Sequence, residues 1–391
     1  VQGTGFTIAA EYVLIDYAGT IGGTGFAGLS LASSRVVGTL TNDIPNTQIK
    51  LTVSAVQDVL WKGDVNANWN LNTTPNWRLS VDNTATNFLT LDSVRLTDSG
   101  LTQPNVTLVG TINPKSVSVE NTTGTYTLGG SAITGTATTT LSKSGDGTLV
   151  LTNDNTFAGV TTLSGGTLQL GSGGPTGKLG AGNVTMSNNA ALAINRSDAV
   201  TMLNVMSGAG SLSKLGTGTL ILGVANSYTG GTTISNGAIT ASIASALGSG
   251  CVTNNSTLNL TLGSGTYSFG AVSGSGTTNI TLGAAGTTLN FASTTTWAGY
   301  NGLVNVGVAQ AAGSGRVVIN NSIPAGATVN VTAHSTLSSA SATANHGAAL
   351  TLNGGDTGES LGQLRLDSSS IWSGPITLAG NITGSNDAFI G

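Results

Sequence analysis

Residues 141–171 read LSKSGDGTLVLTNDNTFAGVTTLSGGTLQLG, and residues 212–242 read LSKLGTGTLILGVANSYTGGTTISNGAITAS. The two stretches align without a gap, so that Asn155, for example, corresponds to Asn226. Self-similarity at a fixed interval is typical of stacked repeats, in which each unit buries its apolar face against its neighbours. These two stretches therefore predict a repeat architecture for the chain.

The short runs inside each copy alternate apolar and polar residues, as in TLVL and TTLS, and Gly, Asn or Asp interrupts them every few residues. This is the pattern of strands and turns, with no helical period. Ordinary domains contain about 25% charged residues, whereas this chain of 391 residues contains 7%, together with 58 glycines. Its hydrophobic content of 39% argues against disorder. We predict an all-β fold, a parallel β-helix (β-solenoid), because separate units of about 70 residues have too few large apolar residues to close their own cores.

The composition divides the chain into three regions. Residues 1–58 contain several strand patterns and relatively many charged residues, and we interpret them as the end of a preceding solenoid or as a small β module. Residues 59–88 contain three of the five tryptophans, and we predict that they form a junction. Residues 89–391 are predicted to form the parallel β-helix, with its strong repeat copies at 141–211 and 212–271.

An aromatic residue followed two positions later by Gly marks four successive units. The four rings, at nearly equal intervals along the chain, are Phe157, Tyr228, Trp297 and Trp372. A ring at a strand end supplies apolar surface, and Gly two positions later would permit a turn of positive φ. If the rings occupy equivalent places, about 70 residues correspond to about three turns, and the whole chain corresponds to roughly 17 turns.

The two strong copies also predict a core and a backbone constraint. We expect eight aliphatic side chains to point into one apolar interior: Leu149, Leu151, Leu163, Leu168, Leu220, Leu222, Ile234 and Ile239. Gly147 and Gly218 occupy the same place in the two copies. Since only Gly tolerates a positive φ or a very close neighbouring backbone, we predict one of these two conditions at both positions.

The shared string L-[ST]-K-x-G-x-G-T-L-x-L-x-x-x-N-x-[YF]-x-G-x-T-T-[IL]-x-x-G resembles the passenger-associated strand repeat of bacterial autotransporters and related giant surface proteins. Both strong copies satisfy this string nearly throughout, and the later units satisfy it in part. The resemblance implies a right-handed parallel β-helix that is secreted through a bacterial envelope. It also implies use on the cell surface, for adhesion or as extracellular matrix.

The sequence contains no set of residues typical of a catalytic, cofactor-binding or metal site, and we predict a non-enzymatic protein without a cofactor. His334 and His346 have no companion ligands for a metal ion. A polysaccharide-cleaving enzyme would need two carboxylates that face one cleft. The carboxylates nearest the aromatic segment are Glu11, Asp16, Asp58 and Asp64.

Other functional classes are excluded by charge and hydropathy. The net charge of −4 gives no basic surface for nucleic acid. No stretch reaches the roughly 18 apolar residues of a membrane span. Cys251 is the one cysteine, so an intramolecular disulfide is excluded.

Trp61, Trp69 and Trp77 follow one another at equal intervals. Regularly spaced rings on a surface would stack on sugars, which makes them the candidate glycan-binding or interaction surface. The alternative is a local aromatic core that fills the junction, and we favour this alternative.

Two functions follow from these observations, together with one remote alternative. Both ends of the chain are strand-like with few charges, so they offer no polar cap, and uncapped strands pair with neighbouring strands. We therefore expect a secreted structural protein of the cell surface or extracellular matrix. Its partners would be further copies of itself, stacked head to tail into fibres, or further repeats of the same chain. The alternative is an adhesin or glycan-binding passenger whose partner is an extracellular polysaccharide, and the remote alternative is a β-helical polysaccharide-cleaving enzyme.

Overall fold

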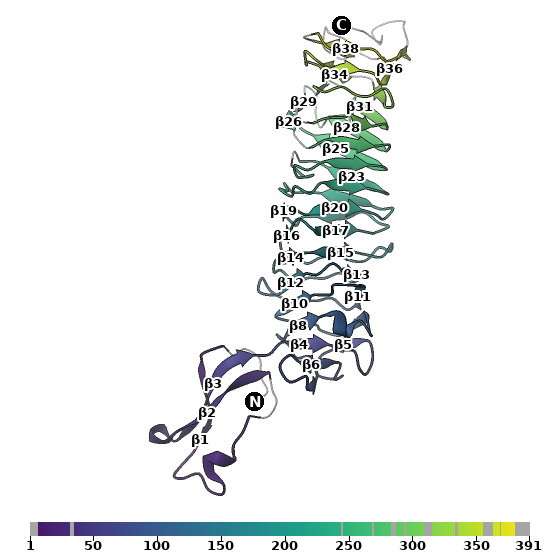
Figure 1. Ribbon diagram of the computed structural model, residues 1–391. Coiled ribbons are helices and arrows are strands. Elements are labelled where there is room, and N and C mark those ends of the chain that lie inside the picture. Colours follow the sequence, from purple (N-terminus) through teal and green to yellow (C-terminus); the bar gives the residue numbers. More distant parts are fainter. Residues whose placement is uncertain are drawn as a thin grey trace. The chain divides into compact units, whose positions relative to one another are not determined.

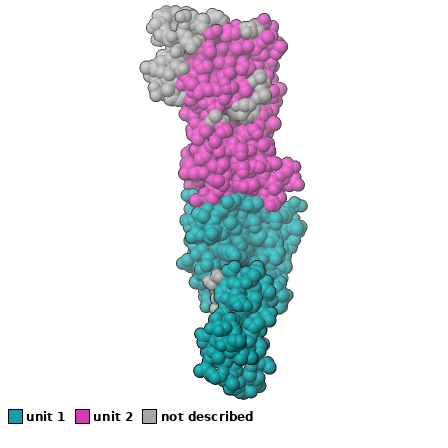
Figure 2. All heavy atoms as spheres, turned by 90° about the vertical axis from the view of Figure 1, so that its left-hand side faces the viewer, with its two compact units in different colours: residues 1–162, 178–180 teal, residues 163–177, 181–391 magenta. Residues whose placement is uncertain are grey.

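The structure is a computed structural model that describes residues 7–31, 35–243, 245–267, 270–282, 287–292, 295–308, 315–332, 335–354, 363–367 and 369–379. The described part is all-β apart from three short 3-10 helices, η1 (Gly25–Gly28), η2 (Ile44–Asn46) and η3 (Asp98–Gly100). The chain divides into two compact units, drawn in different colours in Figure 2. The first unit contains residues 1–162 and 178–180, and the second contains residues 163–177 and 181–391.

The first unit begins with an antiparallel sheet of three strands. In the order β1–β3–β2, these are β1 (Glu11–Asp16), β3 (Gln48–Val56) and β2 (Val36–Asp43). Val36, Leu51 and Val53 are buried together in this sheet. The antiparallel pairing distinguishes this segment from the parallel strands that follow it.

The remaining strands of the first unit begin in the tryptophan-rich segment. Strand β4 (Val59–Trp61) pairs antiparallel with β6 (Trp77–Leu79), and β6 pairs antiparallel with β7 (Ala85–Thr86). Strand β4 also pairs parallel with β8, the first strand of a regular stack. One parallel sheet of this stack contains β8 (Ser93–Leu96), β10 (Ser116–Val119) and β12 (Thr140–Lys143). The other contains β5 (Asn68–Asn70), β9 (Asn105–Val109), β11 (Thr125–Gly130) and β13 (Thr148–Leu151).

The second unit is a stack of parallel strands in three main sheets (Figure 1). The first sheet contains β15 (Gly166–Leu170), β17 (Ala190–Ile194), β20 (Ser211–Lys214), β22 (Thr232–Ile234), β24 (Val252–Asn254), β27 (Val272–Gly274) and β30 (Gly299–Tyr300). The second contains β18 (Val200–Met202), β21 (Thr219–Leu222), β23 (Ala238–Ala241), β25 (Thr257–Leu262), β28 (Thr277–Leu282), β31 (Leu303–Val308), β33 (Thr328–Val331), β36 (Ala349–Leu352) and β39 (Ile376–Leu378). The third contains β26 (Gly265–Tyr267), β29 (Thr288–Phe291), β32 (Gly315–Ile319), β34 (Ser335–Ser339) and β37 (Leu364–Leu366).

Two shorter parallel pairs complete the second unit. Strand β16 (Val184–Met186) pairs with β19 (Met206–Gly208), and β35 (Asn345–His346) pairs with β38 (Ile371–Trp372). The short strand β14 (Thr161–Leu163) lies where the chain passes from the first unit to the second.

The predicted parallel β-solenoid is confirmed, and its handedness stays a prediction. The turns vary in length, because Leu192 pairs with Leu212, whereas Thr277 pairs with the more distant Leu303. The described residues of the two units contain about 12 turns, fewer than the roughly 17 expected from a uniform strand spacing. The expected number was too high because residues 1–58 include an antiparallel sheet and several turns are long.

The eight side chains expected in the core are all buried, with at most 1% of their surface exposed. The pairing register of the strands explains this burial, because like residues lie above one another along a sheet. In the second sheet of the second unit, Leu220 pairs with Ile239, and Ile239 pairs with Leu258. Each fully buried aliphatic side chain of such a column stabilises the fold by about 1.5–3 kcal/mol. The apolar interior predicted from the strand alternation is therefore confirmed.

The shift between the two repeat copies does not correspond to a whole number of turns. The runs GTLQL and GAITA occupy the same place in the two copies, and they contain β15 and β23. Strand β15 pairs with β17 of the first sheet, whereas β23 pairs with β21 and β25 of the second sheet. The same sequence motif therefore folds on two different faces of the second unit. Our expectation of about three turns per repeat assumed that equivalent residues share a face, and this assumption was wrong.

The repeat glycines are required by close approach and not by positive φ. Gly147 and Gly218 are not among the residues of positive φ. A Cβ atom at Gly147 would lie 2.1 Å from Nδ2 of Asn121, and one at Gly218 would lie 1.9 Å from the carbonyl oxygen of Asp198. Glycine is therefore needed because the neighbouring turn leaves no space for a side chain.

The glycine that follows each aromatic marker is likewise not explained by a positive φ. Gly159, Gly230, Gly299 and Gly374 are also not among the residues of positive φ. A Cβ atom at Gly159 would lie 2.1 Å from the carbonyl oxygen of Thr139. The expected turn of positive φ was wrong, because here too glycine allows adjacent backbones to approach.

The repeat lysines are buried and capped by backbone carbonyls. Lys143 is fully buried, and its Nζ donates to the carbonyl oxygens of Ser144 at 2.7 Å and Gly145 at 2.8 Å. Lys214 is 1% exposed and donates to the carbonyl oxygen of Gly216. Burial lowers the pKa of Lys143 to about 8 and lowers that of Lys214. Both lysines thus close the turn of their own repeat and are not offered to a ligand.

Candidate functional site

The three tryptophans that we considered as a glycan-binding surface are buried. Trp61, Trp69 and Trp77 each have 0% of their surface exposed. The ring of Trp77 makes edge contacts at a centroid distance of 5.1 Å with both other indoles. Trp69 also contacts Phe88 at 5.4 Å. These four rings form an aromatic cluster in which no indole face is open to a sugar, and such edge-to-face packing stabilises the fold around it.

The aromatic marker residues have structural positions as well. Phe157, Tyr228 and Trp297 are buried, and the hydroxyl of Tyr228 lies 2.6 Å from that of Thr232. Trp372 is half-buried and stacks on the ring of His346 at a centroid distance of 4.9 Å. The markers therefore contribute to the core and present no continuous exposed surface.

His346 is held as a neutral ring. It is 1% exposed, its Nδ1 accepts the backbone N–H of Ile323 at 3.3 Å, and its Nε2 lies 3.0 Å from the hydroxyl of Ser339. Burial lowers the pKa of His346 to about 4. His334 lies outside the described residues. Over the described part of the chain, no three His, Cys, Asp or Glu side chains gather as a metal ion would require.

Of the carboxylates near the aromatic segment, Asp64 and Glu120 are in ion pairs, whereas Glu11 and Asp16 are exposed. Asp64 forms an ion pair with Arg78 at 2.5 Å. Glu120 is paired with Arg95 at 2.6 Å and also accepts from Ser118, which lowers its pKa. Burial raises the pKa of Asp58.

The single cysteine, Cys251, is exposed.

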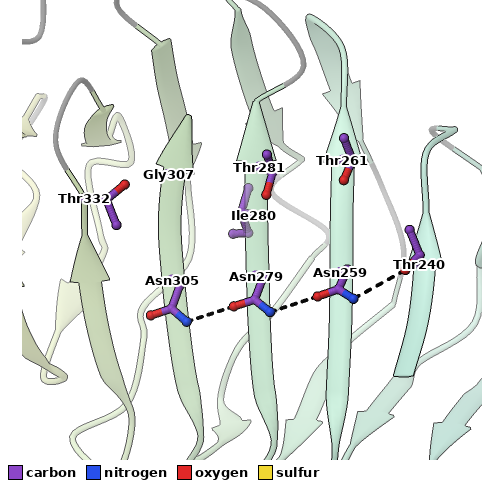
Figure 3. Close-up of a pocket in the computed structure, with 9 residues that line it drawn as sticks. All are labelled: Thr240, Asn259, Thr261, Asn279, Ile280, Thr281, Asn305, Gly307 and Thr332. Carbon is purple, nitrogen blue, oxygen red and sulfur yellow. Dashed lines mark hydrogen bonds between the residues drawn. The ribbon is translucent and has the colours of Figure 1, made fainter. Parts of the chain in front are cut away.

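A polar hollow lies on the second sheet of the second unit, at β23, β25, β28, β31 and the residue that follows β33 (Figure 3). Its volume is about 650 Å³. The residues that line it are Thr240, Asn259, Thr261, Asn279, Ile280, Thr281, Asn305, Gly307 and Thr332. Ile280 is buried in the core, and none of the lining residues is charged.

Three asparagines form one row across the hollow (Figure 3). Nδ2 of Asn305 donates to Oδ1 of Asn279 at 2.8 Å, and Nδ2 of Asn279 donates to Oδ1 of Asn259 at 2.8 Å. Nδ2 of Asn259 in turn donates to the hydroxyl of Thr240 at 3.3 Å. The strand register places these residues in one row, because each is the paired neighbour of the next. We call this row of Thr240, Asn259, Asn279 and Asn305 the amide row.

A second row of residues beside the amide row is interrupted at Gly307. Thr261 pairs with Thr281, and Thr281 pairs with Gly307, which has no side chain. A Cβ atom at Gly307 would lie 2.6 Å from Oγ1 of Thr332. The hydroxyl of Thr332 therefore takes the place that a side chain at Gly307 would occupy.

The sequence predictions missed the amide row. The signal was an Asn at the same place in successive strands, followed in each case by an apolar residue, as in LNL, TNI and VNV. Because the interval from Asn259 to Asn279 is shorter than that from Asn279 to Asn305, no fixed period connects these asparagines in the sequence.

No helix in the described part of the chain has both the length and the apolar character needed to cross a membrane.

Comparisons with known proteins identify the repeat. Residues 141–170 and 212–241 each match the family described as passenger-associated-transport-repeat, which confirms the resemblance read from the sequence. A stretch of 89 residues is 46% identical to the BmaC autotransporter adhesin of Brucella suis biovar 1 (strain 1330). The match covers 22% of this chain and 2% of that adhesin. No solved structure matches this chain.

Proposed function

We propose that this chain, which carries two passenger-associated-transport repeats on a parallel β-solenoid, is a non-enzymatic passenger segment that a bacterium exposes on its surface or releases outside the cell. The observation that carries the proposal is the pair of matched repeats, each built into a solenoid with a buried apolar core. The similarity to part of an autotransporter adhesin supports an adhesive role. In this role the solenoid is a scaffold that holds outward side chains in rows one strand spacing apart, about 4.8 Å.

Antibodies raised against this chain provide the test. We expect them to label intact producing bacteria or to detect the chain in the culture medium. Beads coated with the purified chain should also adhere to cells or to extracellular matrix. Labelling only after the bacteria are permeabilised would contradict the proposal.

End-to-end self-association is a second proposal, supported by β39. Ile376 and Leu378 pair with the buried core residues Leu350 and Leu352, yet they are 38% and 53% exposed. Exposed apolar side chains that continue a core column favour contact with a further turn, from this chain or from another copy. Light scattering at micromolar concentration should then detect oligomers, and Leu378→Asp should dissociate them. The control Thr377→Asp, on the same strand, should leave them intact, and a wild-type monomer would contradict this second proposal.

A further inference from the structure

The amide row has hydrogen-bonding capacity that the fold does not use. A primary amide has two N–H donors and an oxygen with two lone pairs. Asn279 uses one N–H toward Asn259 and one lone pair toward Asn305. One donor and one acceptor therefore remain on this half-exposed side chain. The same pattern holds for Asn259, which donates one N–H to Thr240 and accepts one from Asn279.

The lining of the hollow selects the chemistry of a partner. It contains no charged side chain, so it does not compensate the charge of a phosphate, a sulfated glycan or a nucleic acid. Its one large apolar side chain, that of Ile280, is 1% exposed, so the lining offers no large apolar side chain to a partner. Paired donors and acceptors without charge match the hydroxyl groups of a neutral sugar, each of which both donates and accepts.

The spacing of the amide row points to a chain of sugars. Neighbouring members of the row lie on adjacent strands, about 4.8 Å apart. An extended chain of pyranose units repeats at nearly the same interval per sugar, so successive sugars would meet successive amides.

We propose that the amide row and the hollow beside it bind a neutral polysaccharide that lies across the strands of β23, β25, β28 and β31. This inference deepens the proposed function and rests on it, because the face must be displayed outside the cell. The binding site is the hydrogen-bonding outer face of the solenoid and not the buried tryptophans.

Affinity electrophoresis of the purified chain tests the proposal. Native gels would contain hydroxyethyl cellulose, a soluble β-1,3-glucan, dextran or galactomannan, and we expect at least one of these neutral polymers to retard the chain. The double variant Asn279→Ala/Asn305→Ala should weaken retardation at least fivefold. None of these substitutions changes the net charge, so altered mobility reports binding.

Asn290→Ala is the matched control. Asn290 lies on β29 of the third sheet and accepts a hydrogen bond from Asn320 at 2.9 Å, but it does not line the hollow. The retardation of the Asn290→Ala variant should equal that of the wild type. The proposal is overturned if no neutral polymer retards the chain or if the variants with native melting temperatures bind like the wild type. It is also overturned if the amide row instead holds a second copy of the chain. If binding fails while antibodies still label intact bacteria, the site is wrong and the passenger function stands.

Discussion

Asn155 and Asn226, which occupy the same place in the two repeat copies, make the same two connections to the turns on either side of them. Oδ1 of Asn155 accepts the backbone N–H of Ile133 at 2.9 Å, and its Nδ2 donates to the carbonyl oxygen of Lys178 at 3.0 Å. Asn226 bridges Met206 and Ala246 in the same way, at 2.8 and 2.7 Å. Each asparagine therefore replaces a piece of backbone pairing at a place where no regular sheet joins the turns.

Asn226→Ala should destabilise the fold by about 2–6 kcal/mol, because it leaves two buried backbone groups without partners, at about 1–3 kcal/mol each. Chemical denaturation measures the effect. Asn301→Ala, at an exposed asparagine of the same unit, serves as the control and should change stability by no more than about 0.5 kcal/mol. Equal effects of the two substitutions would show that the bridges are not needed.

The core column on β21 gives a second prediction. Leu220 is fully buried, whereas the neighbouring Ile221 points to the opposite face and is partly exposed. Leu220→Asp should cost several kcal/mol, because it places a charge without a partner in the apolar interior. Ile221→Asp should cost much less. If both variants melt at the wild-type temperature, the inward register of this strand is incorrect.

The close approach at Gly218 gives a third prediction. Gly218→Val should destabilise the fold by more than about 2 kcal/mol, because the side chain would collide with the backbone of Asp198. Gly174 is the appropriate control, since a Cβ atom there meets nothing within 4 Å and its φ is not positive. Gly173 is unsuitable, because its φ of +93° would add backbone strain. Tolerance of Val at Gly218 comparable to that at Gly174 would disprove the steric explanation.

His346 predicts a dependence of stability on pH. Burial lowers its pKa from 6.5 to about 4, so the unfolded chain takes up a proton at a higher pH than the folded chain. The stabilisation is fully present above pH 6.5 and is lost as the pH falls toward 4. The expected loss is about 3 kcal/mol, because each pKa unit corresponds to about 1.4 kcal/mol. Protonation would also break the bond that Nδ1 accepts from Ile323.

Denaturation of wild type and His346→Gln between about pH 4 and 7 isolates this contribution. Glutamine does not titrate, so the difference in the free energy of unfolding should shrink as the pH falls. A difference that stays constant over this range would contradict the assignment of a neutral, buried ring.

The sequence by itself determined the fold class and the composition of the core. The alternation in TLVL and TLIL specifies which side chains point inward, and the shared string specifies the glycines, lysines and asparagines of the repeat. These features are local, because the side chains of a strand alternate between its two faces whatever the rest of the chain does. They were sufficient to predict a parallel solenoid and its buried leucines.

Only the tertiary structure decided which strands share a sheet. The path between Thr277 and Leu303 is longer than that between Leu192 and Leu212, and so the face on which a repeat falls depends on the summed lengths of all intervening turns. For this reason the matching β15 and β23 lie on different sheets, while Asn259, Asn279 and Asn305, which share no repeat period, meet in one row. Burial of the tryptophans was also decided by strand pairing, because the antiparallel pairing of β4 with β6 sets Trp61 opposite Trp77. Hydrogen bonding between parallel strands fixes neighbours across a turn, and no local pattern of residues encodes that distance.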